Sequence, residues 1–214
     1  MTESRPLVEP HLEGGDIEAV ALAIATGYKA CNDLMRGNLA LSTFPVGMEQ
    51  RPYLLRALVD HAMLKVATQR EGFFHDVKWN AAHNCRSLIL TKGQVVMTQH
   101  FMGKKNFRKA ARQAKSRESM ACRNGSLFPV DEECIALFSD GGYVQFLHGG
   151  HLIPDFIHLV IPTEDQRWYS ARSEILVPTP ETVAAEQIRE EMAFQLKTIA
   201  DQEAEEIGNA TVAR

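Results

Sequence analysis

Residues 134–147 read CIALF-SDGG-YVQFL and carry the strongest local signal for the fold. Two short apolar runs flank the turn Ser139-Asp140-Gly141-Gly142. Glycine tolerates the positive φ that tight hairpin turns require. The stretch therefore predicts two antiparallel strands, over 134–138 and 143–147, joined by a hairpin turn.

Further β-prone runs lie on both sides of this stretch. Residues 87–90 and 95–98 flank a turn-forming segment around Gly93, and residues 156–161 and 167–177 flank another that begins at Pro162. Short runs of this kind, bounded by turn residues, are typical of strands joined in hairpins. We expect a mostly antiparallel sheet of about six strands.

Two amphipathic helices are predicted before the first strands. Apolar residues recur at spacings of three and four from Asp16 to Gly37, with Asp16 as the expected N-cap and Gly37-Asn38 as the end. Pro52 suits the first turn of a second helix, which is expected to end near Gly72. These two helices have enough apolar surface to pack on each other or on a sheet.

A long third helix is predicted at the C-terminal end, from Glu181 to Ile207. Its apolar positions are sparse and its acidic residues are dense, which favours packing on a second copy of the chain. The expected fold is a single α+β domain over residues 16–207. Residues 1–15 are expected to form a flexible leader, and residues 208–214 a frayed tail.

Composition excludes several classes of protein. The 214 residues are 45% hydrophobic and 23% charged, with a net charge of -4. A disordered chain, a collagen-like fibre and a disulfide scaffold are thereby excluded. The four cysteines are scattered without a zinc-finger spacing, as expected of thiols in a reducing cytosol. No signal peptide or membrane span is predicted, so we expect a cytoplasmic protein without membrane contact and without a cofactor.

Residues 104–123 form the most unusual segment and are called the basic segment below. They hold eight of the chain's 23 lysines and arginines against the single acid Glu118. The eight cations are Lys104, Lys105, Arg108, Lys109, Arg112, Lys115, Arg117 and Arg123. In a central helix, the spacing places Lys104, Arg108, Arg112 and Lys115 on one face and small apolar residues on another.

A basic helical face of this kind suits phosphate groups. Each phosphate that a protein neutralises releases condensed counterions, so binding is expected to weaken as salt rises. Three other interpretations remain open. The face is solvated, it is neutralised by the acidic C-terminal helix, or it contacts an acidic surface of another protein.

Two clusters of histidine and aspartate are candidates for chemistry. His75 and Asp76 are adjacent, and His75 is a candidate general base. His148, His151 and Asp155 are candidate ligands for zinc or a similar metal. Structural roles for these histidines, as hydrogen-bonding groups at strand ends, compete with both interpretations.

The sequence therefore favours a non-enzymatic binding or regulatory module. Its expected partner is nucleic acid, or a protein that processes nucleic acid, bound through the basic segment. The alternative is a nuclease-like hydrolase with a His/Asp site beside that segment. A further alternative is a subunit of a protein complex with the basic face as its interface, and a homodimer is expected through the C-terminal helix.

Overall fold

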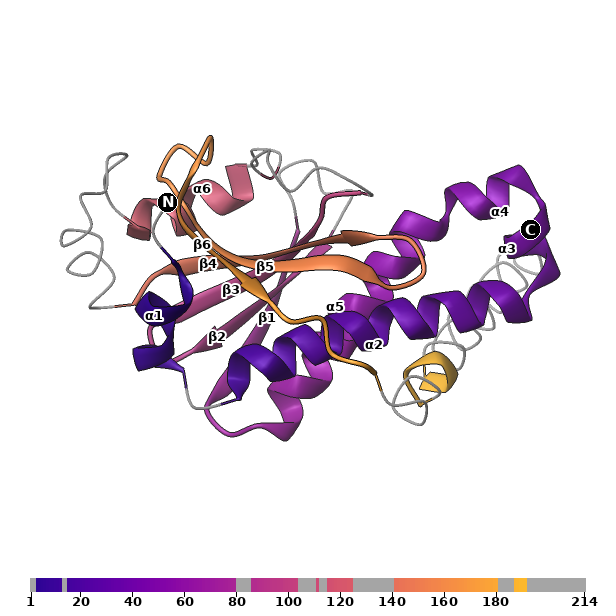
Figure 1. The fold of residues 1–214 in the computed structure, drawn as a ribbon, viewed down its shortest axis with the longest axis horizontal. Helices are drawn as coiled ribbons and strands as arrows, with labels where there is room; N and C mark the ends of the chain where they lie inside the picture. Colours follow the sequence, from indigo (N-terminus) through magenta and orange to yellow (C-terminus); the bar gives the residue numbers. More distant parts are fainter. Residues whose placement is uncertain are drawn as a thin grey trace, which may run out of the picture.

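The computed structural model of the chain describes residues 3–12, 15–79, 86–103, 111, 115–124, 141–180 and 187–191. Their helices and strands are placed as shown in Figure 1. In chain order they are α1 (Arg5–Val8), η1 (Glu9–His11), α2 (Asp16–Gly37), α3 (Leu39–Thr43), α4 (Pro45–Glu49), α5 (Arg51–Gln69), β1 (Phe73–Trp79), β2 (Arg86–Lys92), β3 (Val95–Phe101), α6 (Lys115–Ala121), η2 (Cys122–Asn124), β4 (Tyr143–Gly150), β5 (Pro154–Pro162) and β6 (Tyr169–Ile175).

Six strands form one sheet in sequence order, from β1 at one edge to β6 at the other. Every neighbouring pair is antiparallel except β3 and β4, which are parallel. A mixed α/β fold with a mostly antiparallel six-stranded sheet is thus confirmed. The strand β1 was not predicted, and the strand expected over 134–138 lies outside the described residues.

The glycine pair before β4 has a role that differs from the predicted hairpin turn. Gly141 has φ +82°, and a Cβ at this position would lie 2.3 Å from the Cβ of Gln94. Gln94 belongs to the turn between β2 and β3, and Gly142 accepts a hydrogen bond from the amide of Val96 at 2.8 Å. Glycine is therefore required for close packing against a neighbouring turn as β4 enters the sheet.

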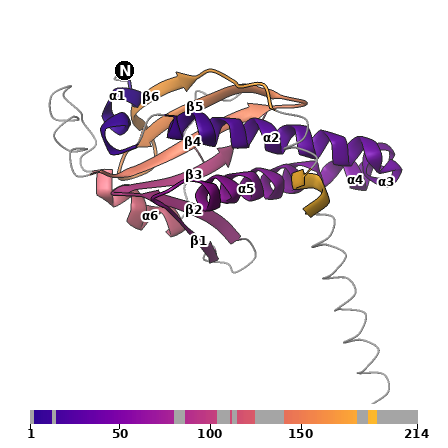
Figure 2. The same cartoon turned by 90° about the horizontal axis from the view of Figure 1, so that it is seen from below.

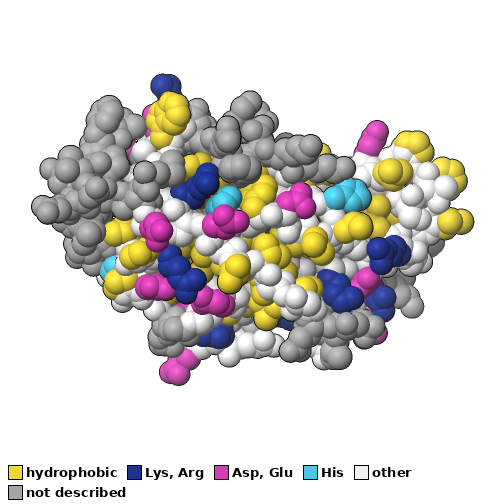
Figure 3. Space-filling model, in the orientation of Figure 1, with side chains coloured by type: hydrophobic (Ala, Val, Ile, Leu, Met, Phe, Trp, Pro, Cys, Tyr) yellow, Lys and Arg dark blue, Asp and Glu magenta, His cyan; other side chains and the backbone are white. Residues whose placement is uncertain are grey.

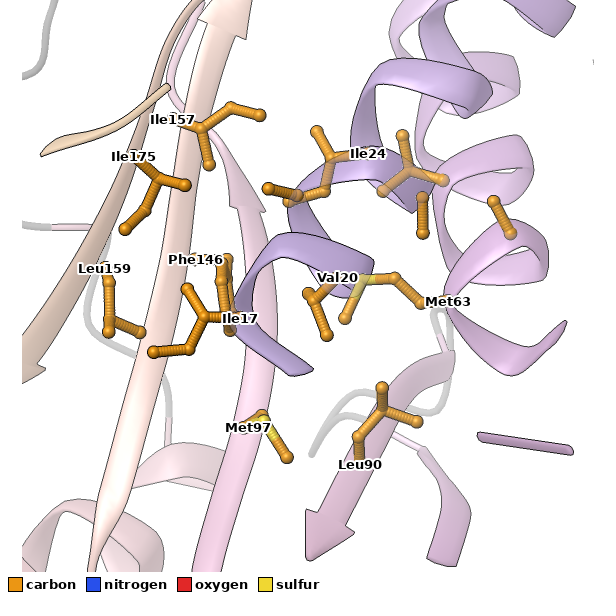
Figure 4. Packing of buried hydrophobic residues seen from close by; sticks show 14 of the residues in the cluster. Ile17, Val20, Ile24, Met63, Leu90, Met97, Phe146, Ile157, Leu159 and Ile175 are labelled. Carbon is orange, nitrogen blue, oxygen red and sulfur yellow. The ribbon is translucent and has the colours of Figure 1, made fainter. Parts of the chain in front are cut away.

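Helices α2 and α5 pack together on one face of the sheet, as both views show (Figures 1 and 2). Their bounds match the two predicted N-terminal helices. Gly15, with φ +85°, takes the N-cap position that was predicted for Asp16, and Asp16 is the first helical residue. Residues of α2, α5 and all six strands contribute to the main core, and ten of its residues are labelled in Figure 4: Ile17, Val20, Ile24, Met63, Leu90, Met97, Phe146, Ile157, Leu159 and Ile175.

Gly27 of α2 packs closely against Val59 of α5. A Cβ on Gly27 would lie 2.7 Å from the Cα of Val59, so a side chain would collide with backbone. We expect Gly27→Ala to lower the free energy of unfolding by about 1–3 kcal/mol, although alanine favours a helix. Urea denaturation measures this change. Gly37→Ala, at a position with no atom within 4 Å, is the matched control and is expected to be neutral or stabilising.

The predicted flexible leader is largely packed against the sheet. Within residues 1–15, the hydroxyl of Ser4 is buried and donates to the carbonyl of Leu159 at 2.6 Å. The side chains of Leu7, Val8 and Leu12 join the main core. The expectation of a loose leader was therefore wrong for α1 and η1, because these three apolar side chains cover the sheet near β5 and β6.

The C-terminal helix was predicted as one long element. Only residues 187–191 of the range 181–207 are described, and they are helical. Ile188 is buried, and Glu191 lies 2.8 Å from both His61 Nε2 and Lys65 Nζ of α5. A helix of the predicted length is thus not supported, and the predicted tail over 208–214 lies outside the described residues. Among the helices that the structure describes, none has the length and hydrophobicity of a membrane span.

Candidate functional site

Helix α6, the longest described part of the basic segment, lies on the sheet face opposite α2 and α5 (Figure 1). Ala121 is buried against Ile89, Val96 and Tyr143. Earlier in the segment, Ala111 packs on Leu147 and Val160 in a separate small cluster. Of the small apolar stripe predicted for the segment (Phe107, Ala110, Ala111 and Ala114), only Ala111 is described, and it is buried on the sheet. Ala121 was not part of that prediction.

Hydrogen bonds fix both described parts of the segment. The amide of Ala111 donates to the hydroxyl of Tyr169 at 2.8 Å. After α6, the Asn124 side chain donates to the carbonyls of Tyr143 and Pro162, both at 2.8 Å. It also accepts from the Tyr143 amide at 2.7 Å. Buried side-chain bonds to backbone of this kind hold the chain in one position, so these described parts are anchored on β4, β5 and β6.

Arg117 turns inward from α6 toward the sheet. Its Nη1 lies 2.7 Å from His100 Nδ1. Burial, with the nearby charge of Arg117 as the next cause, lowers the pKa of His100 well below its ordinary value. The imidazole is therefore neutral. The same Arg117 Nη1 lies 3.1 Å from His100 Nε2. His100 Nε2 also lies 2.9 Å from the Thr98 hydroxyl, which in turn lies 2.7 Å from the Tyr143 hydroxyl.

The residues predicted to bind nucleic acid are only partly described. Lys104, Lys105, Arg108, Lys109 and Arg112 lie outside the described residues, and Lys115 begins α6 with its side chain outside them. Of the other two cations of the basic segment, Arg117 is half-buried and Arg123 is exposed. Arg117 therefore supports the fold of this surface, and Arg123 remains available on it.

The candidate catalytic residues His75 and Asp76 occupy successive positions in β1. Successive side chains of a strand point to opposite faces of the sheet, so the two groups do not form one acid–base site. Asp76 instead pairs with Lys78 at 3.4 Å on its own face. Both candidate residues are exposed on an edge strand.

The candidate metal ligands His148, His151 and Asp155 are not brought together. His148 is fully buried and contacts the α2 side of the sheet, whereas His151 and Asp155 are exposed in and after the β4–β5 turn. Within the described ranges, no group of three or more His, Cys, Asp or Glu side chains is placed to hold a metal ion.

His148 instead belongs to a buried polar chain that sequence reasoning missed. Its Nδ1 lies 3.0 Å from the Tyr28 hydroxyl of α2, and its Nε2 lies 2.8 Å from Gln99 Oε1 of β3. Gln99 donates through Nε2 to Asp60 Oδ1 of α5 at 2.8 Å. Because Gln99 uses its oxygen toward His148, the imidazole carries its proton on Nε2 and accepts from Tyr28.

Burial changes the acidity of three members of this polar chain. It lowers the pKa of His148 to about 3 and raises the pKa of the Tyr28 hydroxyl. It also raises the pKa of Asp60 to about 6, against the opposing effects of Gln99 and Arg56. The polar chain therefore links α2 and α5 to the centre of the sheet, and the His148 imidazole within it is neutral.

Exposed apolar side chains gather at the end of the molecule that α3 and α4 form, beyond the sheet (Figures 1 and 3). They are Leu39, Phe44, Val46, Met48 and Tyr53, each more than half exposed. This surface is remote from α6 (Figure 1). Exposed apolar area beside the basic segment would favour a subunit interface at that segment. These five residues do not supply such an area.

Comparisons with known proteins give no match to a family model, to a curated protein or to a solved structure.

Proposed function

We propose that this chain is a non-enzymatic module that binds nucleic acid through the basic segment. The observation that carries the proposal is the charge of residues 104–123, with eight lysines and arginines against one glutamate. A surface of that charge attracts the phosphate backbone and releases its counterions on binding. A regulatory role in the cytosol belongs to the same proposal.

The anchoring of the segment supports this function. Ala111 and Ala121, together with Asn124 directly after the segment, tie its described parts to one face of the sheet through buried contacts. Fixed points of this kind reduce the conformational entropy that a binding segment loses when it meets its partner. The separation of His75 from Asp76, on opposite faces of β1, removes the support for a nuclease site built on that pair.

Fluorescence anisotropy with labelled single- and double-stranded DNA and RNA tests the proposal. We expect the wild type to bind at low salt, with an affinity that falls steeply as salt rises. The variant Arg108→Glu, Arg112→Glu, Lys115→Glu is expected to bind at least roughly tenfold more weakly, because three attractive charges become repulsive.

A control variant with the same change in net charge separates a local site from general attraction. Arg36→Glu, Arg167→Glu, Arg189→Glu reverses three cations outside the basic segment and is expected to retain most of the binding. An equal loss in both variants would contradict a site at residues 104–123. If a folded wild type bound no nucleic acid at low salt, the proposal would fail, and an acidic protein partner would become the better explanation.

A further inference from the structure

Strand β1 lies at one edge of the sheet that the described residues form. It is the terminal strand in the order β1 to β6, and all its residues after Phe73 are exposed. Three of them are large and apolar: Phe74 is 70% exposed, Val77 48% and Trp79 46%. A terminal strand with exposed apolar side chains is a template for pairing with another strand.

Strand β1 lacks two of the features that usually protect an edge strand, a proline and a bulge. The strand is seven residues long and contains no proline. Its pairing with β2 runs without a bulge from Phe73–Lys92 to Trp79–Arg86. Its only charges other than that of histidine are Asp76 and Lys78, which have opposite signs and share one face.

These two charges decide which strand fits. When two copies of β1 pair antiparallel about a two-fold axis, one residue faces itself. An axis at Val77 places Asp76 opposite Lys78 of the second copy, and Lys78 opposite its Asp76. An axis at Asp76 would set two aspartates against each other, and an axis at His75 would pair Asp76 with Phe74. Opposite charges across strands stabilise a pair and like charges destabilise it, so the charges favour the axis at Val77.

We propose that β1 pairs with β1 of a second copy of this chain, centred on Val77, so that the sheet continues across the dimer. On the face that carries Val77, its exposed side chain meets its own equivalent. Trp79 lies opposite His75 of the second copy on the same face. The interface is thus an antiparallel strand pair closed by two ion pairs and three side-chain contacts. A homodimer through the C-terminal helix remains a separate prediction.

Charge reversal tests the register with the full chain. We expect sedimentation velocity between about 1 and 300 µM to show the wild type shifting from monomer to dimer, in the range of a small interface. Asp76→Lys and Lys78→Asp are each expected to raise the dimer Kd by roughly tenfold, because both cross-strand pairs become repulsive.

Mixing these two single variants gives the decisive result. In the Val77 register each repulsive pair becomes attractive in the mixture, so a heterodimer is expected to form with an affinity close to that of the wild type. The double variant Asp76→Lys, Lys78→Asp should also recover dimerisation. Circular dichroism checks that every variant is folded. A wild type that stays monomeric, or single variants that dimerise as well as the wild type, would overturn the proposal.

Disulfide trapping supplies an independent test. With Cys85, Cys122 and Cys134 replaced by serine, Val77→Cys is expected to cross-link two copies under mild oxidation. Phe74→Cys is the matched control, since it is more exposed but lies opposite residue 80 of the second copy instead of itself. Equal or faster cross-linking through position 74 would contradict the register.

Discussion

Substitution of Asp16 by alanine is expected to lower the free energy of unfolding by about 3–5 kcal/mol, measured by urea denaturation at pH 7. The carboxylate is fully buried and holds two cations. Oδ1 lies 2.8 Å from Arg70 Nη2, and Oδ2 lies 2.8 Å from Lys92 Nζ. Without Asp16, the ammonium group of Lys92, whose side chain is 8% exposed, would be left in the protein interior without this partner.

The position of Asp16 in the fold explains why one residue has such a large effect. It begins α2, Arg70 directly follows α5, and Lys92 ends β2. Three elements distant in sequence therefore meet at one carboxylate. Lys92 also lies 5.1 Å from the centroid of the Phe73 ring, which further confines its charge.

Glu18 provides the matched control for this prediction. It lies in the same first turn of α2, has the same favourable relation to the helix dipole, and pairs with Arg5, but its side chain is 49% exposed. Glu18→Ala is expected to cost less than about 1 kcal/mol, as exposed ion pairs do. Similar losses for both variants would show that the dipole, and not the buried contacts, accounts for the effect of Asp16.

The helices of the main core could be predicted because their large apolar residues recur at helical spacing. In α2, Ile17, Val20 and Ile24 repeat at this spacing and face the core, so the sequence pattern indicates both the helix and its core-facing side. The edge strand β1 carries no such signal. Its residues after Phe73 are exposed on both faces, and apolar–polar alternation covers only the four residues from Asp76 to Trp79.

Local turn chemistry could not show which strand is the neighbour of β4. Gly141 and Gly142 have the composition of a hairpin turn, yet β4 pairs with β3 in parallel. The close approach of Gly141 to Gln94 depends on a contact between residues that are distant in sequence. A hairpin rule based on neighbouring residues does not contain that information.

The face of the sheet to which the His148 side chain points could have been predicted, but its hydrogen-bond partners could not. Val144, Phe146 and His148 alternate along β4 and share the face that the helices cover. This alternation alone argues against a metal site with the exposed His151. The hydroxyl of Tyr28 and the amide of Gln99 reach His148 only through the packing of α2 and β3 on β4, which spacing along one strand does not reveal.

The polar chain from Asp60 to Tyr28 is expected to give the protein a stability that depends on pH in two opposing ways. The pKa of His148 is about 3 in the fold, against an ordinary value of 6.5, so its contribution is complete above pH 6.5 and is lost as pH falls toward 3. That loss reaches about 5 kcal/mol. Lowered pKa values of His100 and His158 act in the same direction.

Asp60 acts in the opposite direction over part of this range. Its pKa is about 6 in the fold and 3.8 ordinarily, so its contribution is present below pH 3.8 and is lost as pH rises through 6. Asp60→Asn keeps an oxygen that accepts from Gln99 and removes the buried charge. Below pH 4 the variant and the wild type are expected to be equally stable, whereas at pH 7 the variant is more stable by up to about 3 kcal/mol.

Urea denaturation of both proteins at one-unit steps from pH 4 to pH 8 measures this difference. Between pH 4 and 6 the contributions of Asp60 and His148 to the pH dependence of the unfolding free energy cancel in the wild type. Without the Asp60 carboxylate, only the contributions of the histidines remain. The unfolding free energy of Asp60→Asn should therefore rise with pH more steeply than that of the wild type, by about 1.4 kcal/mol per unit. If the variant were less stable at pH 7 with an unchanged slope, Asp60 would be ionised at no cost, because its pairing with Arg56 and Gln99 would outweigh its burial.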